Sequence, residues 1–156
     1  TNYVGQRIYS NRSELTDNHH WGNVSVLRTN TMKYLANYMR KGQLEKMFFC
    51  FPDPHFKKKN WRRRIINDGL LSQYAHFMKE GGLLYTVTDV KDLYDWEYDC
   101  LKRHKMFEEV SKEELQKNGD VIIQAIENDT EEGMKVKRMG KPCWSAVFRR
   151  VKTPEY

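Results

Sequence analysis

The sequence predicts an α/β fold with a mostly parallel sheet. Short apolar runs typical of strands alternate with segments whose apolar residues recur three and four positions apart, as in amphipathic helices. The length of 156 residues suits one domain with its own core, so we expect residues 1–156 to form a single domain. No apolar run approaches the roughly 18 residues that a membrane helix needs.

The first forty residues predict a helix, a loop, a strand and a second helix. The first helix covers residues 1–15, and a loop rich in turn formers follows at 16–20. Val24–Leu27 is predicted to be a short strand. Asn30 or Thr31 could then cap a helix from Met32 to about Met39.

The middle of the chain predicts a strand, a helix and a second strand. The nearly continuous apolar run Met47–Phe51 is typical of a central strand buried on both faces. The next helix begins at Asn67 or Asp68, and we expect Gly81–Gly82 to close it in a left-handed cap. Leu83–Val87 is the following strand.

The last third predicts one helix and two further strands. The helix runs from about Lys91 to Lys102, and the strands cover Phe107–Val110 and Ser145–Val151. Between them, residues 115–130 are ambiguous, since 121–126 fits either a strand or a helix.

Polar residues follow several of these elements at one expected edge of the sheet. Ligands of α/β folds bind at the carboxyl ends of the strands. The segments Arg28–Thr31, Pro52–Lys57 and Thr88–Asp89 all come directly after predicted strands. We therefore expect them to line one edge, and we look for chemistry there.

Charge is segregated along the chain, although the formal net charge is only +6. Residues 52–66 hold six lysine and arginine side chains against one carboxylate, whereas residues 86–99 hold five acidic side chains against one lysine. Such segregation favours an anionic partner beside a separate polar pocket, and nucleic acid is the first candidate.

Asp53 is the strongest candidate for a reactive carboxylate. Pro52 and Pro54 restrict the backbone on both sides of it, so its side chain would be held rigidly beyond a strand. The alternative is a proline turn in which Asp53 only caps a turn or a helix.

The basic run from Lys57 to Arg64 encloses Trp61. Closely spaced cations repel one another unless an anion lies among them, and phosphates do this well while Trp61 could stack on a base. The alternative is a solvated loop or helix face.

Other chemistries find little support. Cys50, Cys100 and Cys143 are odd in number and widely spaced, which argues against a disulfide framework or a thiolate zinc site. The five histidines lack ligand spacing, so we expect no metal. The chain has neither the G-x-S-x-G of a serine hydrolase nor the G-x-x-x-x-G-K-[ST] of a P-loop enzyme.

Four segments stand in order between about residues 23 and 151: Leu27–Lys33, the proline-flanked run Met47–Lys57, Thr86–Asp89 and Thr130–Gly133. Together they resemble the eukaryotic branch of the tRNA (guanine-N7-)-methyltransferase family. The resemblance implies a Rossmann-like class I S-adenosylmethionine-dependent methyltransferase fold. It also implies methylation of a guanine N7 in the variable loop of tRNA.

The resemblance assigns site residues position by position. Asp53 matches the family's active-site aspartate. The residues implied to hold the cofactor, S-adenosyl-L-methionine, are Asn30, Thr31, Cys50, Thr130 and Glu132. Those implied to contact the substrate RNA are Lys33, His55, Lys57, Lys58, Trp61, Arg62, Arg63, Asp89 and Glu131. A purely structural alternative for Thr130 is the cap of a helix whose first turn holds the two glutamates.

The family's fold opens with a strand, a glycine-rich cofactor loop and a second strand, none of which this chain contains. We therefore expect the chain to be the C-terminal part of a methyltransferase domain, N-terminally incomplete and with exposed strand edges. Alone it should bind S-adenosylmethionine weakly and show no methyltransferase activity.

The resemblance also implies partners and a location. The partners are tRNA and a WD-repeat non-catalytic subunit, without membrane or metal, and the expected location is the nucleus, with the cytoplasm as a second compartment. Two rival hypotheses remain: a non-catalytic RNA-binding module, in which the run from Lys57 to Arg64 binds phosphates, and an accessory subunit of a tRNA-modifying complex.

Overall fold

The computed structural model describes residues 2–14 and 21–153, and the chain divides into two compact units, residues 1–38 and 39–156. The single domain over residues 1–156 stays a prediction. The first unit contains the helices α1 (Asn2–Glu14) and α2 (Thr31–Tyr34) and the short 3₁₀ turns η1 (Trp21–Asn23) and η2 (Leu35–Asn37). The loop expected at 16–20 lies outside the described residues.

Two expectations for the first unit need correction. Val24–Leu27 is not a strand but irregular backbone, with Leu27 more than half exposed. The carbonyl oxygen of Val24 accepts a hydrogen bond from the Arg12 guanidinium at 2.5 Å. This carbonyl is therefore bonded to a side chain and not to the backbone of a neighbouring strand. The helix expected from Met32 is one α-helical turn followed by η2, and Asn30 is its N-cap.

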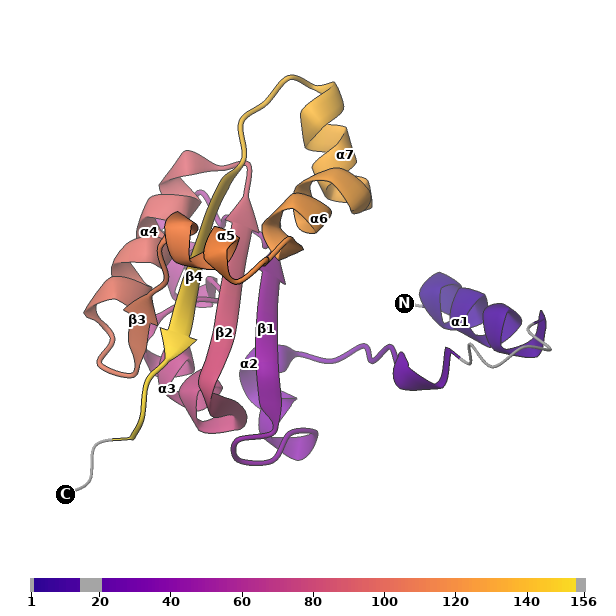
Figure 1. Ribbon diagram of the computed structural model, residues 1–156, viewed down its shortest axis with the longest axis horizontal. Helices are drawn as coiled ribbons and strands as arrows, with labels where there is room; N and C mark the ends of the chain where they lie inside the picture. Colours follow the sequence, from indigo (N-terminus) through magenta and orange to yellow (C-terminus); the bar gives the residue numbers. More distant parts are fainter. Residues whose placement is uncertain (1, 15–20, 154–156) are drawn as a thin grey trace. The chain divides into compact units, whose positions relative to one another are not determined.

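The second unit contains a four-stranded sheet of mixed direction (Figure 1). Its strands are β1 (Leu44–Cys50), β2 (Met78–Thr88), β3 (Phe107–Glu109) and β4 (Trp144–Arg150), in the order β1-β2-β4-β3. β1 and β2 are parallel, while β4 is antiparallel to both of its neighbours. β1, β2 and β3 therefore run the same way and only β4 is reversed. The α/β class is confirmed, but two of the three pairings between described strands are antiparallel, so the expected mostly parallel pairing is not observed there.

Helices cover both faces of this sheet (Figure 1). α3 (Asp68–Phe77) and α4 (Lys91–Arg103) pack on one face, and α5 (Lys112–Lys117) and α6 (Ile122–Asp129) lie over the other, with α7 (Glu131–Arg138) packed against α6. In the ambiguous segment 115–130, residues 115–117 end α5 and 122–129 form α6, with a turn between them, so 121–126 is not a strand. Within the described residues, none of the helices is long and apolar enough to cross a membrane.

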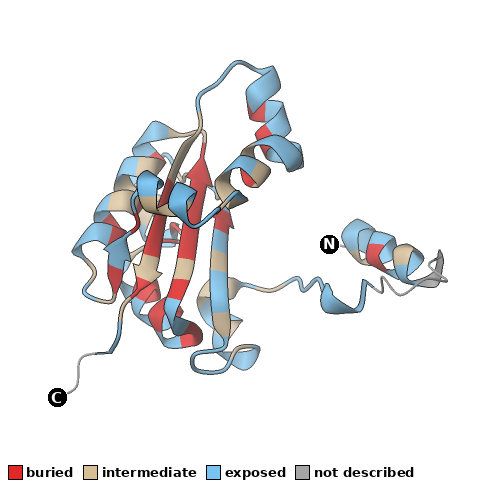
Figure 2. Ribbon diagram, viewed as in Figure 1, coloured by how far each residue is buried: buried red, intermediate tan, exposed pale blue. Residues whose placement is uncertain are grey.

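Side chains of β2 alternate between the two faces of the sheet and pack against the helices on both faces. Tyr85 points to one face, where it packs with Val110 and Val147. Its neighbours Leu84 and Thr86 are fully buried on the other face. Figure 2 shows the result: burial is concentrated in β2 and β4.

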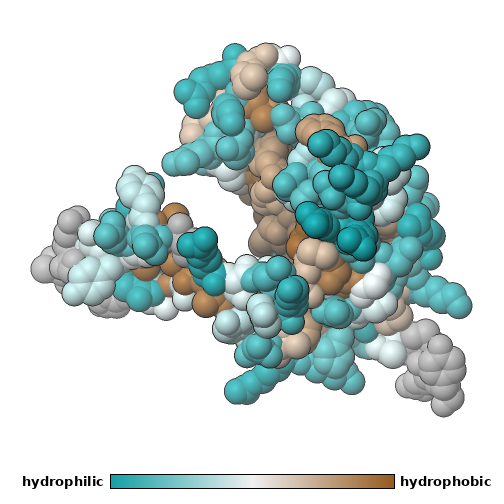
Figure 3. Space-filling model, turned by 180° about the vertical axis from the view of Figure 1, so that it is seen from behind, coloured by the Kyte–Doolittle hydropathy of each residue, from teal (hydrophilic) through white to brown (hydrophobic). Residues whose placement is uncertain are grey.

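β1 departs from the expectation of a strand buried on both faces. It pairs only with β2 among the described strands, and its side chains Phe48 and Cys50 are exposed, Phe48 by 47%. An apolar run alone cannot distinguish a central strand from an apolar edge strand, which is why the prediction was wrong. The exposed strand edge that the sequence predicts is observed at β1, and Figure 3 shows apolar surface open in a band on the second unit.

The boundary between α3 and β2 is also corrected. Of the two predicted starts, Asn67 or Asp68, Asn67 is the N-cap of α3, since its side-chain oxygen accepts a hydrogen bond from the Leu70 amide at 3.1 Å. The helix ends at Phe77, however, and Gly81–Gly82 lies within β2 rather than in a cap. A Cβ on Gly82 would stand 2.8 Å from the Lys79 carbonyl oxygen, and Gly81 has a φ of +80°, so this irregular start of β2 requires both glycines.

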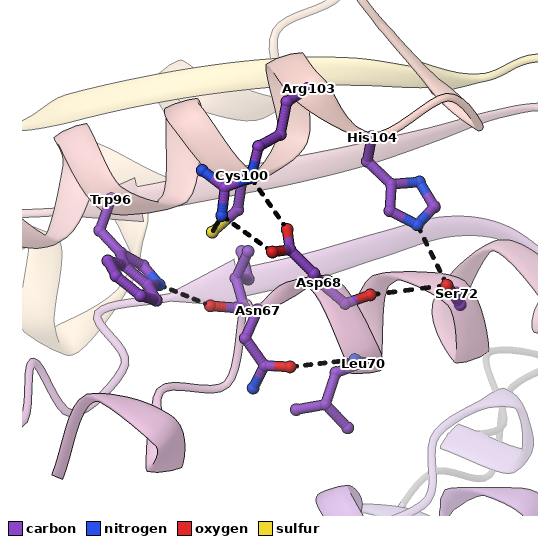
Figure 4. A network of polar contacts seen from close by, with 9 residues as sticks. Asn67, Asp68, Leu70, Ser72, Trp96, Cys100, Arg103 and His104 are labelled. Carbon is purple, nitrogen blue, oxygen red and sulfur yellow. Dashed lines mark hydrogen bonds and ion pairs between the residues drawn. The ribbon is translucent and has the colours of Figure 1, made fainter.

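Polar contacts fasten α3 to α4 behind the sheet (Figure 4). Two nitrogens of the Arg103 guanidinium donate to the Asp68 carboxylate at 3.2 and 3.0 Å. The indole of Trp96 donates to the Ile66 carbonyl at 2.9 Å. Trp96 is therefore fixed against the segment that leads into α3.

Candidate functional site

Two of the three predicted polar segments meet at the carboxyl edge of the parallel strands. Cys50 at the end of β1 is paired with Val87 of β2, and the Phe51 amide donates to the Val87 carbonyl at 2.7 Å. The loop 51–57 and the pair Thr88–Asp89 therefore leave the same edge, the end to which the arrowheads of β1 and β2 point in Figure 1. Asn30, Thr31 and Lys33 belong to the first unit and are described only within it.

The loop around Asp53 has an unusual backbone. Phe51 and His55, two non-glycine residues, have φ values of +50° and +46°. Conformations of this kind cost on the order of 1 kcal/mol or more each and cluster at functional sites. The Asp53 carboxylate accepts a hydrogen bond from the His55 amide at 3.0 Å, yet its side chain remains 72% exposed. The loop thus presents an oriented carboxylate to solvent.

The basic run follows as the 3₁₀ helix η3 (Lys58–Arg63), with Lys57 as its N-cap. Within the described part of the chain no ion pair involves its exposed cations, which are Lys57, Lys58, Lys59, Arg62 and Arg63. Like charges without counter-ions create a positive surface beside Asp53.

Trp61 is packed against protein groups rather than presented openly. The Arg64 guanidinium lies 4.7 Å from its ring centroid, and the Trp96 ring lies 5.4 Å away, centroid to centroid. Nζ of Lys58 stands 5.9 Å from the centroid of the same ring. Stacking of Trp61 on a base stays a prediction, and these neighbours limit the free ring surface.

Asp89 faces the segment that enters β4. Its carboxylate lies 3.9 Å from Nζ of Lys141, and it is largely shielded, with 27% of the side chain exposed. Burial raises the pKa of the nearby Cys143 thiol, and the charges of Glu127 and Asp89 raise it further. The residues after α7 therefore approach the same edge as Asp53.

Thr130 is the junction between α6 and α7, as the structural alternative predicted. Its hydroxyl donates to the Ile126 carbonyl at 2.6 Å and accepts from the Gly133 amide at 3.1 Å, so it caps α7. Glu132 pairs with Lys135 at 3.3 Å, and Glu131 is exposed in the first turn. Contacts of these residues to a cofactor or to RNA stay predictions.

Two buried residues near the site were missed by sequence reasoning. Arg64 was one cation of a run whose other members are exposed, and nothing in the run marks it as buried. Glu97 was counted in an acidic segment, although it shares a helical face with Leu93, Cys100 and Leu101, and this spacing is a signal for burial. No cluster of three or more potential metal ligands occurs among the described residues.

Comparison with known proteins defines the class. Residues 4–146 match the family model described as a putative methyltransferase, and the chain belongs to this family. The sheet and its helical layers are consistent with a Rossmann-like methyltransferase fold.

The relatives make the comparison more specific. The chain is 48% identical over 154 residues to the tRNA (guanine-N(7)-)-methyltransferase of Caenorhabditis elegans and 49% identical over 151 residues to that of Arabidopsis thaliana. These matches cover 99% and 97% of the chain but 59% of each relative. The enzyme of the same name from Scheffersomyces stipitis is 48% identical, with 51% of its length covered. The resemblance seen in the motifs is confirmed, and the chain spans somewhat over half the length of the curated relatives it matches.

Proposed function

We propose that this protein transfers a methyl group to N7 of a guanine in tRNA, in the variable loop. The observation that carries the proposal is the Asp53 carboxylate, oriented by its own loop and exposed at the carboxyl edge of β1 and β2, directly before a helix of unpaired cations. The names of the relatives support the same reaction.

The reaction needs positioning more than proton transfer. Guanine N7 has a free lone pair and no proton, so its attack on a methyl group requires no strong base. Alignment of the nucleophile and stabilisation of the positive charge that develops on the purine would dominate. A fixed carboxylate serves both purposes, because it accepts hydrogen bonds from the N1–H and N2–H edge of guanine and faces the developing charge.

Methyltransferases of this kind in general use S-adenosylmethionine, which supplies the methyl group from its sulfonium. Two observations fit the residues expected to hold it. Asn30 is the exposed N-cap of α2, but its carboxamide makes no capping hydrogen bond there and can serve a ligand instead. Cys50 is exposed at the end of β1, where a small, weakly polar side chain can line an adenosine.

The exposed cations of η3 suit the phosphates of tRNA. A non-catalytic RNA-binding surface would use the same cations, but it gives no role to the oriented carboxylate of Asp53. A WD-repeat subunit as partner and a nuclear location belong to the same proposal.

The test is to incubate the whole protein with tRNA and a methyl donor labelled in its methyl group, and then to analyse the nucleosides. We expect the label in 7-methylguanosine. A matched tRNA transcript containing 7-deazaguanosine, which lacks N7, should take up none. Label in another nucleoside would refute the proposed position, and tRNA binding without any label would favour the non-catalytic module.

A further inference from the structure

Arg64 differs from the other cations of its run because it is buried. Only 3% of its surface is exposed, whereas the five other lysine and arginine side chains between residues 57 and 63 are exposed. A guanidinium is costly to remove from water unless its donors and its charge are matched by the protein. The contacts of Arg64 show which protein groups surround its guanidinium.

The first partner of Arg64 is the loop of Asp53. Nε of Arg64 donates a hydrogen bond to the carbonyl oxygen of Pro54 at 3.0 Å. The other end of the loop is held by the bond from the Phe51 amide to the Val87 carbonyl. Asp53 therefore lies between two hydrogen bonds that hold the loop, one to β2 and one from Arg64.

Two tryptophan rings form the second set of contacts of the guanidinium. Its central carbon lies 4.7 Å from the ring centroid of Trp61 and 5.1 Å from that of Trp96. Trp96 is itself fixed by its hydrogen bond to the Ile66 carbonyl (Figure 4). The two rings also contact each other, at 5.4 Å between centroids, so the guanidinium lies beside the pair, and contact with aromatic rings suits its charge and leaves its N–H groups able to donate.

Acidic groups of the helix behind the sheet act on the charge of Arg64. Burial lowers the pKa of its guanidinium, while the carboxylates of Glu97 and Asp92 in α4 oppose that change. Glu97 is fully buried and accepts a hydrogen bond from the Thr86 hydroxyl of β2. The acidic groups that favour the charged form of Arg64 thus belong to α4 of the same chain.

We propose that Arg64 is a positioning residue, which holds the Pro54 carbonyl and thereby fixes the strained loop that presents Asp53, rather than one of the RNA-contacting cations. This inference rests on the proposed function for its catalytic consequence, but the ordering of the loop can be measured without any activity. Two residues of the loop have positive φ values. Removing the hydrogen bond from Arg64 should therefore let their backbone move to more favourable φ values.

The experiment compares Arg64→Lys and Arg64→Gln with Lys59→Gln, a matched control that removes one exposed cation from the same run. Hydrogen exchange of the segment 52–57, followed at the His55 amide that donates to Asp53, should become roughly tenfold faster or more in both Arg64 variants, because neither lysine nor glutamine can contact the two rings and donate to Pro54 as a guanidinium does. It should not change in the control. The amides of β2 and β4 serve as the measure of intact folding.

Kinetics provide the second measurement on the same variants. A displaced carboxylate should lower kcat by between about 10-fold and 100-fold with little change in tRNA affinity. Unchanged exchange in 52–57, or a loss of tRNA affinity like that of Lys59→Gln with unchanged kcat, would overturn the inference. If the wild-type protein makes no 7-methylguanosine, the proposed function fails while the exchange measurement still decides the role of Arg64.

Should both Arg64 variants fail to fold, Trp61→Phe tests the same arrangement. The Trp61 indole nitrogen is buried and has no hydrogen-bond partner in the described part of the chain, so this change removes no hydrogen bond and reduces the ring surface that contacts Arg64 and Trp96. A smaller but measurable increase of exchange in 52–57 is expected, and no increase would count against the inference.

Discussion

The hydroxyl of Thr86 donates a hydrogen bond to the carboxyl group of Glu97, and this contact joins β2 to α4 in the interior. The second carboxyl oxygen of Glu97 has no hydrogen-bond partner among the described residues. A buried carboxyl group with incomplete hydrogen bonding resists ionisation. Burial accordingly raises the pKa of Glu97 to about 7, although Thr86 and Arg64 act in the opposite direction.

Glu97 should make the stability of the fold depend on pH. Between about pH 4.5 and pH 7 the folded protein keeps a proton that the unfolded chain has lost. The free energy of unfolding therefore falls as the pH rises through this window, by up to roughly 3 kcal/mol, and the contribution is constant above it. Glu97→Gln removes the effect, so its stability relative to the wild type should improve from pH 5 to pH 8.

Urea denaturation of both proteins at the two pH values measures this difference. Glu113→Gln, at an exposed glutamate of α5, is the matched control and should show an offset that does not vary with pH. A pH-independent offset for Glu97→Gln as well would mean that the group is ionised in the folded protein throughout.

Replacing the exposed cations Lys57, Lys58, Arg62 and Arg63 by glutamine should weaken tRNA binding and reduce its salt dependence. Each phosphate that the protein no longer binds lowers the slope of log K against log salt by about 0.9 for a duplex and somewhat less for single strands. Titrations of tRNA at several salt concentrations give the slope. Removing three exposed lysines elsewhere, Lys105, Lys112 and Lys117, should change it much less. An unchanged slope for the first variant would show that the run is a solvated surface, the alternative that the sequence left open.

Gly133 should tolerate no side chain. A Cβ at this position would stand 2.4 Å from the carbonyl oxygens of both Glu127 and Ile126, because α7 passes close to the end of α6. Gly133→Ala should therefore lower the free energy of unfolding by about 1–3 kcal/mol. Thermal or urea denaturation checks the value.

The matched control is Gly69→Ala in α3, where the new Cβ would meet only Asn67 Oδ1 at an ordinary 3.6 Å. There alanine should be neutral or stabilising by about 0.5 kcal/mol, because it favours the helix. Equal effects of the two substitutions would contradict the close approach of α6 and α7.

Local signals predicted much of the fold. The cap at Asn67, the apolar spacing of α3 and α4, and the strands that became β2 and β4 all depend on residues close together in sequence. The edge position of β1 and the irregular backbone at Val24–Leu27 depend on which strands lie alongside, and a sequence pattern does not contain that information.

The candidate site likewise contains one residue that local sequence predicts and one that it does not. Asp53 could be singled out because its flanking prolines are adjacent in sequence. The burial of Arg64 could not, because it depends on Trp96 and Glu97, more than thirty positions further along, folding back over the same segment. The sequence therefore does not distinguish Arg64 from the exposed cations beside it, whereas the folded structure does.

The most direct test of a catalytic role for Asp53 is single-turnover methyl transfer by Asp53→Ala in the whole protein. We predict that the rate falls by at least about 100-fold, the size typical of removing one electrostatic interaction with the transition state, while binding of S-adenosylmethionine changes little. Near-normal turnover by this variant would contradict the proposed function of the site, since the carboxylate presented at the end of β1 would then have no part in the reaction.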